Sequence, residues 1–184
     1  MGIGALGIFR YAAMAAFAGA GSPGDVWPLR HVWYASSLSL TIPSIFAVDQ
    51  LVRHPAMTPR KLLGYAAPFL TVYLAVIIVG RATGVPDPLV GGWMPRLTPG
   101  WQWLLVLTQC VFVTLFIGFC IQVMRRVPSR PIRLALAGLV LAHAYLALDG
   151  ILMWIGRPYV RPYLYSEMFA CLALWHAYET AAKS

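Results

Sequence analysis

The chain has 184 residues, of which 60% are hydrophobic and 11% are charged, and its formal net charge is +8 at pH 7. A soluble domain carries roughly 45–50% apolar and about 25% charged residues, so composition argues against one small water-soluble core. We therefore expect an all-α integral membrane protein with a single domain over residues 1–184. Its basic residues lie between apolar runs and not on one soluble face, which argues against a nucleic-acid partner.

The first apolar stretch, residues 1–21, has two interpretations. Arg10 interrupts it, and alanine and glycine make it only mildly hydrophobic, so it is the weakest of the predicted membrane helices. A basic residue before a short apolar run that ends in small residues is also typical of a secretory signal. We favour the helix, and the sequence leaves the signal open as the alternative.

Five further segments each hold about 20 mostly apolar residues, the length that spans a bilayer. Linkers rich in proline and glycine separate them, and the longest covers residues 80–100. Proline and glycine end helices, so each linker marks a boundary. The prediction is a bundle of five to six transmembrane helices, the five stronger ones over residues 33–52, 62–80, 102–124, 132–156 and 159–178.

Lysine and arginine near the helix ends predict the orientation, because cytoplasmic loops carry the excess of these residues. Successive linkers lie on opposite sides of the membrane, so the basic residues fall into two sets. The set with more lysine and arginine should be cytoplasmic. With six helices, the protein would be a multi-pass protein of the cell membrane with both termini in the cytoplasm. The denser set is Arg53, Arg60, Lys61, Arg125, Arg126, Arg130, Arg133 and Lys183, and the other is Arg30, Arg81, Arg96, Arg157 and Arg161.

Two of the six acidic residues, Asp149 and Glu167, interrupt apolar segments. A short loop centred near residue 158 joins these segments, so they should pack antiparallel. Asp149 lies nine residues before that centre and Glu167 nine residues after it. At about 1.5 Å per residue both carboxyl groups should lie at the same depth, in the outer third of the bilayer.

A charged carboxylate in hydrocarbon costs about 2.5–3.5 kcal/mol on insertion scales, so the pair needs an explanation. The structural explanation is an interfacial ion pair with Arg157 or Arg161 in the connecting loop. The functional explanation is a site that binds a ligand or shares a proton. Tyr145 and Tyr163, one helical turn from the acids, favour a pocket with an aromatic lining. We expect Asp149 and Glu167 as its catalytic groups and Tyr145, Tyr163, Trp154 and His143 as its substrate-binding groups.

No cofactor and no metal site is predicted. Cys110, Cys120 and Cys171 form no CxxC motif and lie in apolar runs, where they are expected to pack as small side chains. His143 and His176 do not align as a pair of haem ligands would. The chain has no GxxxxGK[ST], GxSxG or HExxH motif, which argues against an NTPase, a common serine hydrolase and a zinc protease.

The first functional hypothesis is therefore a membrane-embedded acid/base enzyme, a lyase or isomerase of the cyclase kind, acting on an isoprenoid-like molecule. A protonated carboxyl group beside aromatic faces suits that chemistry. The alternatives are a proton-coupled or cation-binding transport bundle, and a non-catalytic subunit or sensor module of a larger membrane assembly. Membrane lipids and a lipophilic small molecule are the expected partners, with a homo-oligomer or a larger membrane complex left open.

Overall fold

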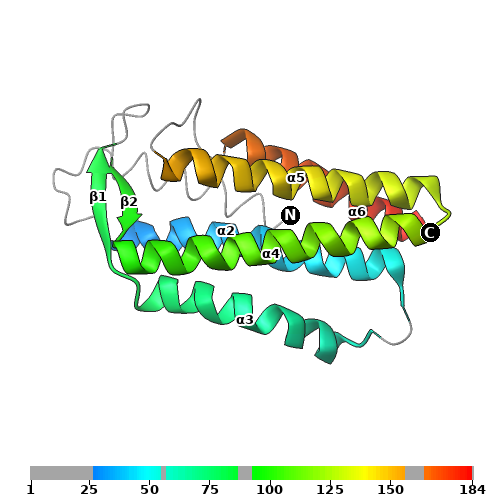
Figure 1. Cartoon of the computed structure of the whole chain (residues 1–184), viewed down its shortest axis with the longest axis horizontal. Helices are drawn as coiled ribbons and strands as arrows, with labels where there is room; N and C mark the ends of the chain where they lie inside the picture. The colour runs from blue at the N-terminus through cyan, green and yellow to red at the C-terminus, as the bar shows by residue number, and fades with distance from the viewer. Residues whose placement is uncertain (1–26, 55–56, 87–92, 156–163, 184) are drawn as a thin grey trace. The chain divides into compact units, whose positions relative to one another are not determined.

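The computed structural model describes residues 27–54, 57–86, 93–155 and 164–183, and these residues are predominantly helical (Figure 1). The described part of the chain contains five helices. They are α2 (Trp27–Val52), α3 (Pro59–Ile78), α4 (Pro99–Arg126), α5 (Arg130–Trp154) and α6 (Leu164–Lys183).

These helices match the five stronger predicted segments, with shifted ends. Helix α2 begins at Trp27 instead of residue 33, and α6 continues to Lys183 instead of ending at residue 178. The predicted helix over residues 1–21 lies outside the described residues. So does the loop over residues 156–163, where the last helix was expected to begin.

Within the described part of the chain, three helices are long and apolar enough to cross a membrane, over Pro59–Ile78, Pro99–Arg126 and Arg130–Leu152. The apolar stretch Leu40–Val52 of α2 is shorter. Helix α6 carries Glu167, Glu179 and Lys183 and is correspondingly more polar. Length and composition therefore support the membrane assignment through α3, α4 and α5.

The linker over residues 80–100 corrects the all-α prediction. It contains two short antiparallel strands, β1 (Ala82–Pro86) and β2 (Trp93–Leu97), with Ala82 opposite Leu97 and Pro86 opposite Trp93. The backbone N–H of Thr98 also donates to the carbonyl of Arg81 at 2.9 Å. Glycine and proline inside the strands hide the alternating pattern by which strands are recognised in a sequence, and this explains the missed hairpin.

The chain divides into two compact units, which are described separately. The first comprises residues 1–39 and 68–108 and includes the hairpin, and the second comprises residues 40–67 and 109–184 and includes α5 and α6. That residues 1–184 form one domain stays a prediction.

Helices α5 and α6 pack against each other in the second unit, and they run antiparallel (Figure 1). The buried side of α6 carries the larger Leu174 and a stripe of small side chains three or four residues apart, Ser166, Ala170, Ala173, Ala177 and Ala181. A Cβ atom added at Gly138 of α5 would lie 3.8 Å from the Cβ of Ala173. Small residues at such an interface let two helix backbones approach closely.

Helix α6 is also tied to α2 by two side chains that bond to backbone carbonyls. The Arg53 guanidinium donates to the carbonyl of Ala181 at 2.6 Å, and the Tyr178 hydroxyl donates to the carbonyl of Pro43 at 2.9 Å. Arg53 has a φ of 46°, in the left-handed region that ends helices. The C-terminal turn of α2 and that of α6 therefore lie together.

The close approach at the small stripe predicts the effect of enlarging it. Ala177 has no exposed surface, so Ala177→Leu should overpack the interface and lower the free energy of unfolding by about 1–3 kcal/mol. Ala182 is exposed on the same helix, and Ala182→Leu should change stability by less than about 0.5 kcal/mol. Reversible unfolding of the purified protein in detergent measures both, and equal effects would contradict the described interface.

Candidate functional site

Helix α5 carries two buried side chains with ionisable groups, His143 and Asp149, which are 4% and 6% exposed. The other three acidic side chains that the structure describes, Asp49, Glu167 and Glu179, are half-buried or exposed. Asp149 is therefore the acidic group most completely removed from the surface in the described part of the chain. This singles out α5 as the element that positions the candidate site.

Asp149 is held by a serine of the neighbouring helix. Its Oδ2 atom accepts a hydrogen bond from the Ser166 hydroxyl, and Ser166 has no exposed surface. A hydrogen bond to a buried carboxyl group restricts its orientation and contributes to the stability of the fold. The bond also joins α5 to α6 at the level where the sequence places the acidic pair.

The described hydrogen-bond partner of Asp149 on α6 is the residue next to the predicted one. The depth predicted for Asp149 on α6 pointed to Glu167, and the residue that meets it is the adjacent Ser166. Asp149 and Ser166 therefore lie at the same level along the two helices, and the pairing with Glu167 stays a prediction. Ser166 could have been found as the first member of the small stripe that continues with Ala170 and Ala173, because that spacing defines the side of α6 that faces α5.

Glu167 is half-buried and lies directly after Ser166. Neighbouring residues on a helix project about 100° apart, so Glu167 is turned away from the direction in which Ser166 meets Asp149. Arg157 and Arg161, the predicted partners of an ion pair, lie outside the described residues. Both explanations of the acidic pair therefore stay predictions.

His143 has one ring nitrogen paired and the other unpaired. Nδ1 lies 2.9 Å from the carbonyl oxygen of Leu139, one turn earlier in α5. A carbonyl only accepts, so Nδ1 carries the hydrogen and Nε2 of the neutral ring is an acceptor. Nε2 is buried and has no hydrogen-bond partner in the part of the chain that the structure describes.

Two phenylalanines of α4 pack against the His143 ring. The ring centroid of Phe116 lies 4.3 Å from that of His143, with an interplanar angle of 35°, and that of Phe112 lies 5.8 Å away at 54°. Neither phenylalanine offers a hydrogen bond. An unpaired buried acceptor costs about 1–3 kcal/mol, a cost that an apolar side chain at this position would avoid. Such groups are exceptional in folded proteins and mark candidates for a functional role.

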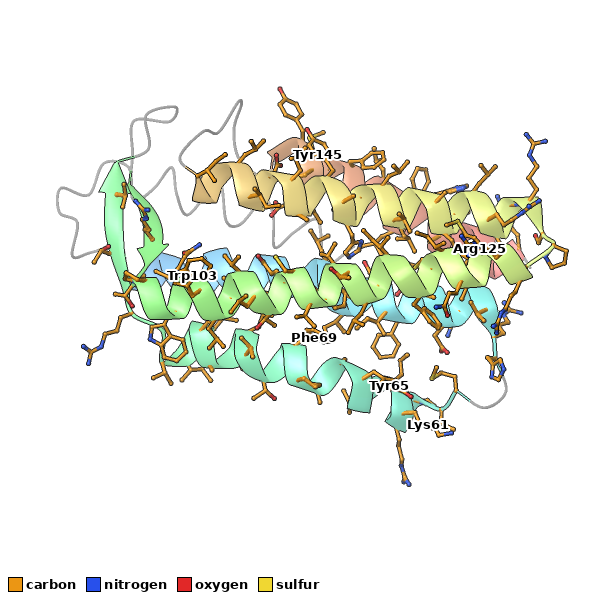
Figure 2. All side chains as sticks on the ribbon, in the orientation of Figure 1. Lys61, Tyr65, Phe69, Trp103, Arg125 and Tyr145 are labelled. Atoms are coloured by element: carbon orange, nitrogen blue, oxygen red, sulfur yellow. The ribbon has the colours of Figure 1, made fainter. Side chains whose placement is uncertain are left out.

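The aromatic side chains predicted around the acids are only partly described. Tyr145 is half-buried on α5, one turn before Asp149 (Figure 2). Trp154 is the last residue of α5, and its side chain lies outside the described part of the structure. Tyr163 also lies outside it. The predicted pocket of two carboxyl and two phenol groups stays a prediction. The buried polar side chains that the structure describes on α5 and α6 are Asp149, Ser166 and His143.

Metal-binding potential is low among the side chains that the structure describes. They include no group of three or more histidine, cysteine, aspartate or glutamate residues that could hold a metal ion. The three cysteines are free, with Cys110 exposed, Cys120 buried and Cys171 between these extremes. The chemistry that these residues offer is proton transfer and hydrogen bonding.

Comparisons with known proteins provide no family for this chain. No protein family model matches it, and no match is found among curated proteins or solved structures. Its function must therefore be argued from its own residues.

The hydrogen bond between Asp149 and Ser166 predicts that two serine-to-alanine substitutions differ in their effect on stability. Ser166→Ala removes the donor to a buried carboxyl group and should lower the free energy of unfolding by about 1–3 kcal/mol. Ser44 is equally buried, but its hydroxyl donates within its own helix, to the Leu40 carbonyl at 2.7 Å. Ser44→Ala is therefore the matched control and should be close to neutral. Chemical denaturation in detergent measures the pair, and a Ser166→Ala variant as stable as Ser44→Ala would argue against the bond.

Proposed function

We propose that this chain is an integral membrane protein that binds a lipophilic small molecule beside α5 and exchanges a proton with it through Asp149. The observation that carries the proposal is a buried carboxyl group, hydrogen-bonded to Ser166, within a long and mostly apolar helix. An ionisable group placed inside a membrane-spanning segment is expensive and most often serves function.

Contact with membrane lipids is supported by the exposed sides of α4, α5 and α6. Large apolar side chains recur on these exposed sides every three, four or seven residues, whereas the buried stripe of α6 consists of small side chains. In water such continuous apolar surface would drive association, whereas lipid tails cover it without cost. These side chains are Val111, Leu115 and Phe119 on α4, Leu134, Leu141 and Leu148 on α5, and Met168, Leu172 and Trp175 on α6.

The chemistry that fits best is acid/base catalysis on an isoprenoid-like molecule, as in a lyase or an isomerase. Asp149 in its acid form transfers its proton to one carbon of a double bond, which leaves a carbocation on the other carbon. Aromatic faces stabilise such a cation, and Tyr145, one turn before Asp149 on α5, is the side chain proposed to supply one. Loss of a proton from a neighbouring carbon to Glu167 forms the new double bond and completes an isomerisation.

The proposed reaction predicts hydrogen exchange into the bound molecule. Wild-type protein, purified with the small molecules that accompany it and incubated in D2O, should introduce deuterium at carbon, which mass spectrometry detects after extraction into ordinary water. Asp149→Asn keeps the shape but cannot transfer the proton, so exchange should slow by about 100-fold or more. Glu167→Gln should have an effect of the same order.

The matched control is Glu179→Gln, because Glu179 lies on the same helix, is exposed and pairs with Lys183 at 2.6 Å. It should exchange at the wild-type rate. Wild-type exchange rates in both Asp149→Asn and Glu167→Gln would remove the acid/base proposal.

We further propose that both termini face the cytoplasm. Eight exposed cations lie at or just beyond one end of α2, α3, α4, α5 and α6, and only Glu179 is an exposed acid there among the described residues. Figure 2 labels two of them, Lys61 at the start of α3 and Arg125 at the end of α4. A cytoplasmic position for this cationic end follows from the positive-inside rule.

Single cysteines at the two ends of α4 test this orientation. Helix α4 has 28 residues and is about 42 Å long, enough to cross a bilayer. In a background without native cysteines, Thr98→Cys should react with a membrane-impermeant maleimide in intact cells. Ser129→Cys, in the loop after α4, should react only after the membrane is opened. The reverse pattern would invert the orientation, and reaction of both in intact cells would show that α4 does not span the membrane.

A further inference from the structure

The unpaired Nε2 of His143 determines which hydrogen-bonding group a ligand must carry in order to bind next to this side chain. Because Nδ1 donates to the Leu139 carbonyl, Nε2 is an acceptor and needs a donor. The adjacent Phe112 and Phe116 rings carry no polar hydrogen. The partner of Nε2 must therefore come from outside the described side chains, and a ligand bound beside α5 is such a source.

The surroundings select the kind of donor. An ammonium group also donates, but it would bring a positive charge against two phenylalanines and a neutral imidazole, where its desolvation is costly. A hydroxyl group is neutral and loses far less hydration when it enters an apolar region. Its O–H hydrogen and the Nε2 lone pair then satisfy each other.

We infer that His143 binds the hydroxyl group of a lipophilic alcohol, with Nε2 as the acceptor and with Phe112 and Phe116 packed against the carbons next to that hydroxyl. This inference rests on the proposed ligand binding and names the class of molecule. His143 and Asp149 are six residues apart, which is about 9 Å along α5. The hydroxyl therefore anchors one end of the molecule while the carbon that meets Asp149 lies several bonds away.

The role of His143 is binding and positioning, which separates it from that of Asp149. Loss of the acceptor removes the preference for an alcohol without removing the acid. Loss of the acid removes proton exchange without removing the preference. The two parts of the site are thus open to separate measurement.

The test compares farnesol with farnesyl methyl ether, which has the same chain but no O–H donor. Binding to the full-length protein in nanodiscs is measured by tryptophan fluorescence. Wild-type protein should bind farnesol about tenfold more tightly than the ether, the value of one buried hydrogen bond. His143→Phe, which fills the space of the ring but cannot accept, should bind the two within about twofold of each other.

Two further measurements complete the test. Asp149→Asn should keep the tenfold preference for farnesol even where deuterium exchange is lost, so failure of the acid/base proposal and failure of this inference give different results. If His143→Phe does not fold, nitrogen NMR of wild-type protein labelled at histidine decides. The Nε2 resonance of His143 should be that of an unprotonated nitrogen, and farnesol but not the ether should shift it. Equal affinities of the wild-type protein for alcohol and ether, an unchanged preference in His143→Phe, or an Nε2 that carries the hydrogen would each overturn the inference.

Discussion

The close antiparallel contact of α5 with α6 is the constraint on which the rest of the second unit depends. It exists because α6 presents Ser166, Ala170, Ala173, Ala177 and Ala181 along one side, and small side chains allow two backbones to approach. The same approach brings the Ser166 hydroxyl within hydrogen-bond reach of Asp149. A larger residue in place of Ala173, opposite Gly138, is expected to push the two backbones apart. Packing and the polar site are thus one feature of the structure.

The two buried ionisable groups of α5 are in opposite situations. Asp149 is satisfied by a neighbouring helix, so its hydrogen bond contributes to the stability of the folded chain. His143 is satisfied on one nitrogen only, by a carbonyl of its own helix. Its second nitrogen has no hydrogen-bond partner in the described part of the chain, and a phenylalanine ring packs against the imidazole. In the proposed site, the protein itself supplies a hydrogen bond to Asp149, and the bound alcohol would supply the one that His143 lacks.

Much of the helical architecture could be predicted from the sequence, because the length and apolarity of a segment act locally. Asp149 could also be singled out, since an acid within an apolar run is conspicuous without any knowledge of its neighbours. The hairpin over Ala82–Leu97 could not, because its strands contain glycine and proline and are defined by pairing with each other. Ser166 was passed over because a serine in an apolar helix is common, and its importance depends on which residue of α5 faces it.

The sequence by itself determined that the chain is a set of apolar helices separated by proline- and glycine-rich linkers, and that a carboxyl group lies within one of them. Only the tertiary structure decided which groups meet. A shift of one residue turns a side chain about 100° around a helix, so equal depth along two helices does not choose between Ser166 and Glu167. The same holds for His143, whose free nitrogen is defined by a carbonyl one turn away and by rings from α4. Those neighbours are set by the packing of whole helices, which no local pattern in the chain encodes.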